Sequence, residues 1–117
     1  MSLDSEVKKT LNTILKILKD MKAIRIEVLD IINRGSIADF MVITEGTSSR
    51  HVNSIVNNIV KNLKKKIISV EGVSQAEWAI VDFGDIVVHV FKPEIRDHYN
   101  LEKIWCSNAP NEKKNFG

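Results

Sequence analysis

The residues of this chain that are best placed to do chemistry lie within residues 38–52, in the stretch ADFMVITEGTSSRHV. The stretch holds a carboxylate at Asp39, a Gly-Thr-Ser-Ser segment, and then Arg50 and His51. Such residues serve three kinds of chemistry: metal-assisted nucleotidyl transfer, nucleophilic catalysis by a serine, and binding of a phosphate at the start of a helix. Their spacing decides among the three.

Nucleotidyl transfer requires two carboxylates at alternate positions of one strand, so that both point at the same Mg²⁺ ions. Asp39 closely follows a Gly-Ser pair and is a candidate for the first carboxylate. The second belongs at position 41, which is occupied by Met41. Asp82 and Asp85 offer a third carboxylate, but a third does not replace the missing second. The sequence therefore argues against metal-assisted nucleotidyl transfer at this strand.

Nucleophilic catalysis by Ser48 or Ser49 with His51 is not supported either. Neighbouring residues at the start of a helix diverge around its axis, and no Gly-x-Ser-x-Gly elbow is present. The segment also lacks the lysine and the glycine density of a phosphate loop. We therefore interpret Thr47, Ser48 and Ser49 as the N-cap of a helix, where a hydroxyl accepts a free backbone N–H, and His51 as structural. Phosphate binding at this helix start stays open as the alternative.

Two amphipathic helices are predicted from apolar residues that recur at helical spacing. In the first, lysines cover the remaining surface and the apolar positions are Val7, Leu11, Ile14, Leu15, Leu18 and Met21. The second covers residues 52–63, and Lys64–Lys66 lie near its end. Cations are favourable at a helix C-terminus, so we interpret this triple lysine as a helix end rather than a nucleic-acid patch.

Two strands are predicted between these helices. Ile24–Asp30 alternates apolar and charged residues, which indicates a half-exposed strand. Residues 40–44 are apolar without alternation, which indicates a central strand buried on both sides. The turn between the strands is placed at residues 33–36. Asp39, at the start of the buried strand, is expected to pair with Arg50 and so to hold the following loop.

A tight hairpin is predicted where residues 78–83 and Ile86–Phe91 are joined by Gly84 and Asp85, with a type II′ turn if Gly84 takes the first position. This loop pairs Phe83 with Ile86 and so fixes the register. One face is then wholly apolar and must pack beneath the helices: Ala79, Val81, Phe83, Ile86, Val88 and Val90. The other, mixed face carries Trp78, Ile80, Asp82, Val87, His89 and Phe91. The mixed face is either a second, smaller core against Tyr99 and Trp105 or a protein-binding patch.

Length and composition indicate one globular domain: 117 residues, 44% hydrophobic, 27% charged and a formal net charge of +2. This net charge is too small to indicate a nucleic-acid binder by itself. The single cysteine, Cys106, excludes an intrachain disulfide, and no apolar run reaches the roughly 20 residues of a membrane span. Short helical turns are expected after Pro93, and the polar tail, residues 106–117, is expected to be disordered.

Three motifs follow one another in the chain: ADFMVITEGTSSRHV, a tryptophan with VDFGDIVVHVF, and YNLEKIW. Together they resemble the ribosomal silencing factor family, also called the Iojap or RsfS family, over residues 3–105. The resemblance implies an α/β fold for residues 1–105: a single domain with a mixed β-sheet flanked by helices, nucleotidyltransferase-like but without the catalytic carboxylate pair. Phe40 and Phe83 depart mildly from the family, which often has Tyr at these positions.

The resemblance also implies a function. Members of the family bind the large ribosomal subunit through its universal protein fourteen, block the joining of the small subunit and lower translation when nutrients are scarce. We therefore expect a cytoplasmic repressor of translation that acts by steric blocking and is not an enzyme, without catalytic residues, a metal site or a cofactor. Neither a membrane nor a specific nucleic-acid sequence is expected as its partner. A nucleotide-binding or nucleotidyl-transferring enzyme of the same fold, and a homodimer that buries the mixed face, are the alternatives.

The predicted partner-binding residues lie on the mixed face and just beyond it: Trp78, Asp82, His89, Phe91, Lys92, Glu94, Arg96 and Tyr99. Trp78 and Tyr99 are expected to be anchors, because aromatic side chains bury a large area at little entropic cost. Asp82 and Glu94 are expected to pair with basic groups of the partner.

Overall fold

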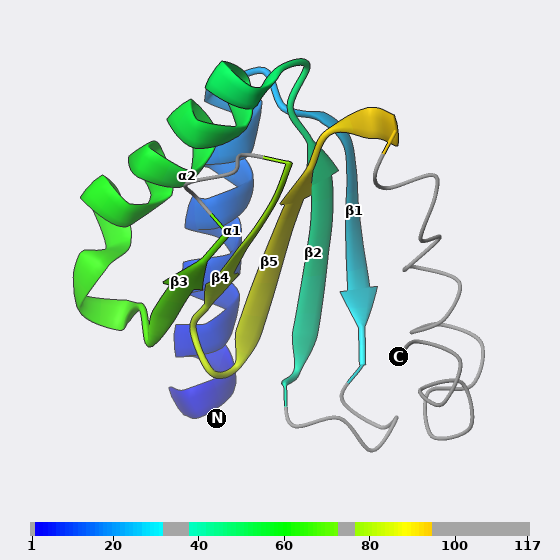
Figure 1. Ribbon diagram of the computed structural model, residues 1–117. Coiled ribbons are helices and arrows are strands. Elements are labelled where there is room, and N and C mark those ends of the chain that lie inside the picture. The colour runs from blue at the N-terminus through cyan, green and yellow to red at the C-terminus, as the bar shows by residue number, and fades with distance from the viewer. Residues whose placement is uncertain (1, 32–37, 73–76, 95–117) are drawn as a thin grey trace, which may run out of the picture.

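The computed structural model describes residues 2–31, 38–72 and 77–94, with side chains from Ser5 onward. They form two helices and one five-stranded sheet (Figure 1). The elements are α1 (Ser2–Asp20), β1 (Ile24–Asp30), β2 (Phe40–Glu45), α2 (Ser49–Leu63), the 3₁₀ helix η1 (Lys64–Lys66), β3 (Ser69–Glu71), β4 (Trp78–Asp82) and β5 (Ile86–Phe91). The strand order is β1-β2-β5-β4-β3, and β2 and β5 are parallel whereas the other neighbours are antiparallel. This mixed sheet flanked by helices confirms the predicted fold class.

The two predicted strands before α2 differ in burial as expected. β2 lies between β1 and β5, and all of its residues after Phe40 are buried, as suits an apolar run without alternation. β1 lies at the edge of the sheet and is mostly exposed. Its pairing with β2 is irregular between Ile24 and Glu27, where Arg25 adopts φ +48°. Nothing in the alternating sequence of β1 indicates this bulge.

The helices α1 and α2 cover the same face of the sheet and seal the main core (Figure 1). The buried residues of α1 are Val7, Leu11, Ile14, Ile17 and Leu18, and those of α2 are Val52, Ile55, Val56 and Ile59. They pack against the apolar face of the β4–β5 hairpin. The lysines of α1 are exposed, as the amphipathic pattern predicts. Of the helices in the described part of the chain, neither is long and apolar enough to cross a membrane.

The register of the hairpin agrees with the prediction pair by pair. Trp78 lies opposite Phe91, Ile80 opposite His89, and the backbone N–H of Phe83 donates to the carbonyl of Ile86 at 2.8 Å. Gly84 has φ +91°, the sign that a type II′ turn requires at its first position. A two-residue loop therefore divides the side chains of both strands between the two faces of the sheet.

Some predictions have other outcomes. The three-residue edge strand β3 was not predicted; it pairs with β4 and extends the sheet by one strand. The turn at residues 33–36, the helical turns beyond Glu94, the disordered tail and the domain boundary at residue 105 lie outside the described residues.

Candidate docking surface

The mixed face of the hairpin belongs to the side of the sheet that α1 and α2 leave uncovered (Figure 1). Since paired residues of neighbouring strands point to the same side, β2 adds Met41 and Ile43 beside Val87 and His89 of β5. We call this side the open face and define it by its residues on the three interior strands: Met41, Ile43, Glu45, Trp78, Ile80, Asp82, Val87, His89 and Phe91.

The open face is not uniformly exposed. Met41, Ile43 and Phe91 are buried in a second apolar cluster with Ile31 and Ala38. Toward β4 the face opens, and its side chains there, Trp78, Ile80 and Asp82, are half-buried. The face is therefore a second core at β2 and β5 and a partly exposed surface at β4. The expected packing of Tyr99 and Trp105 against it lies outside the described residues.

His89 and Phe91 were predicted to contact a partner, but the structure buries both. His89 is 7% exposed and Phe91 is 0% exposed, because they lie on the interior strand β5 beside the second cluster. A partner does not reach such side chains unless this face rearranges. Their place in the fold gives them a supporting role toward Trp78, which stays half-buried.

Three rings pack together at this point. The Trp78 and Phe91 rings are 5.0 Å apart between centroids, and the His89 and Phe91 rings are stacked at 5.8 Å. The indole Nε1–H of Trp78 donates to Nδ1 of His89 at 3.2 Å. An indole is only a donor, so Nδ1 of His89 is unprotonated and the ring is neutral. Burial favours this state, because it lowers the pKa of His89 from 6.5 to about 4. His89 and Phe91 thus fix the orientation of the Trp78 indole.

Asp82 has a structural partner within its own hairpin. Its Oδ1 accepts the backbone N–H of Gly84 at 2.7 Å. A carboxylate that accepts a backbone N–H two residues later supports a tight turn. Asp82 was predicted to pair with a basic group of a partner. In the structure it is half-buried, and its carboxylate stabilises the turn of its own hairpin.

The end of β5 carries an exposed polar rim. Nζ of Lys92 lies 3.6 Å from Oε2 of Glu94, and the Lys92 backbone N–H donates to the carbonyl of Glu77 at 2.9 Å. Both Glu77 and Glu94 are exposed: Glu77 directly precedes Trp78, and Glu94 lies three residues beyond Phe91, the residue paired with Trp78. The other two predicted site residues, Arg96 and Tyr99, lie outside the described residues.

The Gly-Thr-Ser-Ser segment caps α2, as predicted. Ser48 is the N-cap, with extended backbone angles, and its Oγ accepts the backbone N–H of His51 at 3.1 Å. The His51 ring also bonds to this segment, because its Nδ1 accepts the Thr47 backbone N–H at 2.8 Å. Nε2 therefore carries the proton and donates to the carbonyl of Met21 at 2.7 Å. His51 thus connects the start of α2 to the end of α1, a structural role.

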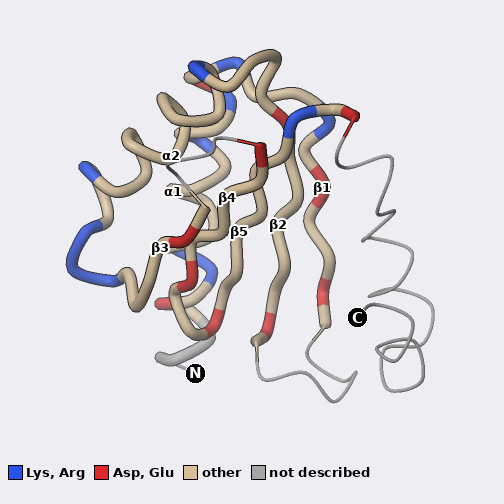
Figure 2. Tube along the Cα trace, in the orientation of Figure 1, with Lys and Arg blue, Asp and Glu red and all other residues tan. Residues whose placement is uncertain are grey.

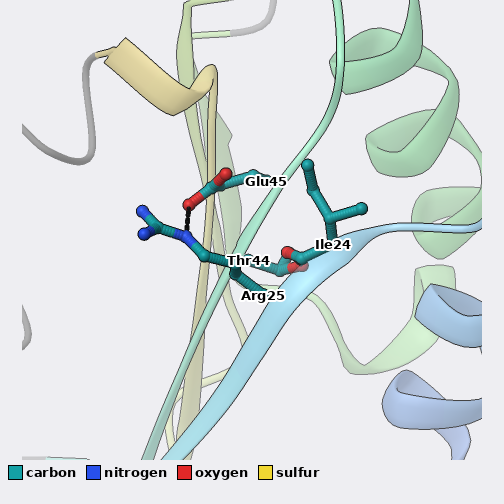
Figure 3. A network of polar contacts seen from close by, with 4 residues as sticks. All are labelled: Ile24, Arg25, Thr44 and Glu45. Carbon is teal, nitrogen blue, oxygen red and sulfur yellow. Dashed lines mark hydrogen bonds and ion pairs between the residues drawn. The ribbon is translucent and has the colours of Figure 1, made fainter.

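The expected pair between Asp39 and Arg50 is wrong. Asp39 precedes β2 and Arg50 follows it, so the six-residue strand separates them by roughly 20 Å. The ion pair near the loop is instead made by Arg25 and Glu45 (Figure 3). The Glu45 side chain is 2% exposed whereas that of Arg25 is 52% exposed, and Thr44 Oγ1 donates to the Ile24 carbonyl at 2.9 Å beside them. The lone carboxylate that ends the buried run FMVITE was the signal for this pair.

Residues 4–116 match the family model described as "Ribosomal silencing factor during starvation". The chain belongs to the ribosomal silencing factor (RsfS) family. The RsfS protein of Zymomonas mobilis is 38% identical over 91 residues, which cover 75% of this chain and 68% of the relative. A mouse protein named "Mitochondrial assembly of ribosomal large subunit protein 1" is 40% identical over 73 residues, which cover 57% of this chain and 32% of that protein.

The fold of this chain is similar to folds already seen in crystal structures. A crystal structure of a protein from Chromobacterium violaceum superposes with a TM-score of 0.80 at 34% sequence identity, covering 84% of each chain. A likeness of this extent shows that the two proteins share one fold.

In this RsfS family member, position 41 does not suit a catalytic carboxylate. Met41 is 3% exposed and packs with Ile43 and Phe91 in the second apolar cluster. A carboxylate in its place would be buried among apolar side chains, where a charge is strongly disfavoured. Among the described residues, no group of three His, Cys, Asp or Glu side chains is arranged to hold a metal ion.

Proposed function

We propose that this RsfS family member is a cytoplasmic repressor of translation that binds the large ribosomal subunit through its universal protein fourteen. Bound there, it occupies the surface that the small subunit needs and blocks joining when nutrients are scarce. No bond is made or broken in this mechanism. Family membership supports the proposal, together with the name of the mouse relative, which refers to the large ribosomal subunit.

The charge of the sheet supports a basic protein as the partner. The described residues 23–31, 38–45, 69–72 and 77–94 contain nine carboxylates and two cations, Arg25 and Lys92. Figure 2 shows these acidic positions along the strands and at their ends. Proteins that bind RNA are rich in Lys and Arg, so a ribosomal protein offers the complementary charge.

The aromatic part of the open face supports the same kind of partner. Trp78 is half-buried; its ring packs against Phe91 and donates a hydrogen bond to His89. A tryptophan whose orientation is already fixed loses little entropy when a partner buries it. Interface centres are enriched in such aromatic anchors, surrounded by polar residues. Trp78, with exposed Glu77 next to it in the chain and exposed Glu94 at the end of the neighbouring strand, has this composition.

Three measurements test the proposal. Purified protein should co-sediment with large ribosomal subunits, bind purified universal protein fourteen, and lower the yield of joined ribosomes in proportion to occupancy. If it does not bind large subunits at all, the proposed function is wrong. If it releases pyrophosphate from nucleoside triphosphates in the presence of Mg²⁺ or Mn²⁺, the enzyme alternative replaces it. A homodimer that buried the open face would have to dissociate before it could bind large subunits. If a dimer forms and binds subunits as tightly as the monomer does, the dimer does not use the open face.

A further inference from the structure

The end of α2 concentrates positive charge. Residues 49–66, which form α2 and η1, contain five cations and no carboxylate. Four of the five lie together at the end, and all four are exposed: Lys61, Lys64, Lys65 and Lys66. We call them the lysine cluster; Figure 2 shows the continuous stretch that Lys64–Lys66 form where α2 ends. The small net charge of the chain therefore conceals two regions of opposite charge, the acidic sheet and this helix end.

Little within the fold neutralises this cluster. Nζ of Lys66 lies 3.7 Å from Oε1 of Glu6, and both side chains are at least half exposed. In the described part of the chain, Lys61, Lys64 and Lys65 have no carboxylate within ion-pair distance. Three exposed cations therefore remain available to an external anion.

The arrangement of the three lysines is unfavourable without such an anion. Lys64 and Lys65 follow Lys61 by three and four residues, so the three side chains lie on one side of the helix end. Like charges at this spacing repel one another and destabilise a helix. The helix dipole, which favours cations near a helix C-terminus, offsets only part of this repulsion. An anion bound to the cluster would relieve the rest.

The surroundings of the cluster indicate which anion fits. A shallow hollow between α1 and the end of α2 is lined by Glu6, Lys9, Thr10, Thr13, Leu63 and Lys66, so Lys9 extends the positive region onto α1. None of these residues is aromatic, so the surface lacks the platforms on which unpaired bases stack. Lysines without aromatic neighbours contact phosphates and do not read sequence. A chain of closely spaced phosphates matches several lysines at once.

We infer that the lysine cluster binds the phosphate backbone of ribosomal RNA on the large subunit, as a second contact beside the protein-binding open face. The inference rests on the proposed function for the identity of the assembly. The positions of the two surfaces agree with simultaneous contact, because η1 leads directly into β3, the edge strand next to β4 (Figure 1). In one assembly, a basic ribosomal protein would then bind the acidic sheet and the neighbouring RNA would bind the lysine cluster.

Triple substitution tests the inference: Lys61→Gln, Lys64→Gln and Lys65→Gln together. The matched control is Lys16→Gln, Lys19→Gln and Lys22→Gln, which removes the same charge from exposed residues at the other end of α1 and its following turn. Binding to large subunits is measured by co-sedimentation between 50 and 200 mM salt. Loss of three phosphate contacts lowers the slope of log binding constant against log salt concentration by about 2–3. The ratio of the wild-type binding constant to that of the cluster variant should therefore shrink about 20- to 40-fold over this range. The control should keep the wild-type slope.

Three further measurements separate the possible outcomes. Both variants should bind isolated universal protein fourteen as wild type does, and only the cluster variant should lose affinity for a 20-base-pair RNA duplex. A photo-crosslinking residue at position 65 should give an adduct with subunits that ribonuclease degrades. A protein adduct there, or an unchanged salt slope for the cluster variant, overturns the inference. If wild type binds no subunits, the proposed function fails, and the RNA duplex alone decides whether the cluster binds phosphates.

Discussion

Val81 and Asp82 are neighbours in β4, yet they occupy opposite environments. Val81 is buried in the main core beneath α1 and α2, whereas Asp82 is half-buried on the open face and supports the turn at Gly84. The same alternation runs through β5, except that His89 and Phe91 of the open face are also buried. A hairpin thus assigns each residue to a face, but the burial of that face depends on what the rest of the chain places over it.

The sharpest test of this difference is a lysine on each face. Val81→Lys should destabilise the domain by more than about 4 kcal/mol, because it buries an unpaired charge in the main core. Ile80→Lys, one residue earlier, should cost only about 1 kcal/mol, since the half-buried site lets the ammonium group reach water. Urea unfolding measures both. If Ile80→Lys unfolds the protein as well, the open face is closed along β4 and the docking surface lies elsewhere.

Acid should weaken the open face through His89. Its pKa is about 4 in the folded protein, below the ordinary 6.5, because burial disfavours the charged ring. Between these values the unfolded chain binds more protons, so stability rises with pH. The contribution is fully present above about pH 6.5, is lost as pH falls toward 4, and amounts to about 3 kcal/mol.

The matched control for this pH dependence is His89→Leu. Its apolar side chain cannot titrate, so the free energy of unfolding should vary less between pH 6.5 and 4 than in wild type. In a Trp105→Phe background, which leaves Trp78 as the only tryptophan, fluorescence follows the same transition at the ring that His89 orients. An unchanged pH dependence in the variant would contradict the neutral, buried state of His89.

Charge reversal at the rim tests the partner proposed for the open face. Glu77→Lys places a cation beside Trp78 at an exposed position and should leave folding unchanged. It should weaken capture by large subunits about 10-fold, or roughly 1.4 kcal/mol, since like charges then face each other. Asp20→Lys makes the same charge change at an exposed position at the end of α1. Equal binding of the two variants would exclude the rim of the open face from the interface.

The smallest predicted effect concerns the cap of α2, which belongs to the helix-covered side. Ser48→Ala should lower stability by about 1 kcal/mol, because the His51 backbone N–H loses its acceptor. Ser49→Ala, in the first helical turn but outside the cap, should change stability by less than about 0.5 kcal/mol. Neither change should alter subunit binding beyond what unfolding explains. Loss of binding by a fully stable Ser48→Ala protein would make this loop part of the interface.

Local chemistry explains why much of the fold could be predicted. Gly84 and Asp85 permit only a short turn, and this turn determines every pair of the hairpin. The run FMVITE has too little polarity for an edge strand, and β2 is interior. Ser48 occupies the position before the apolar spacing of α2 begins, which is where an N-cap is needed.

The failures share a different cause: each depends on distant parts of the chain. β3 has only three residues and exists because β4 supplies its hydrogen-bond partners. Asp39 and Arg50 are close in sequence but are held apart by the strand between them, whereas Glu45 meets Arg25 across a bulge. Alternation placed His89 on the correct face, but it carries no information about what covers that face.

The strand order has a consequence for how the protein is made. Among the strands of the described residues, β5 comes last in the sequence but occupies the middle of the sheet, between β2 and β4. Until it has been synthesised, β1 with β2 and β3 with β4 are separate two-stranded pieces, and such pieces are marginally stable at best in water. The nascent chain therefore cannot close this sheet before residues 86–91 have left the ribosome that makes it.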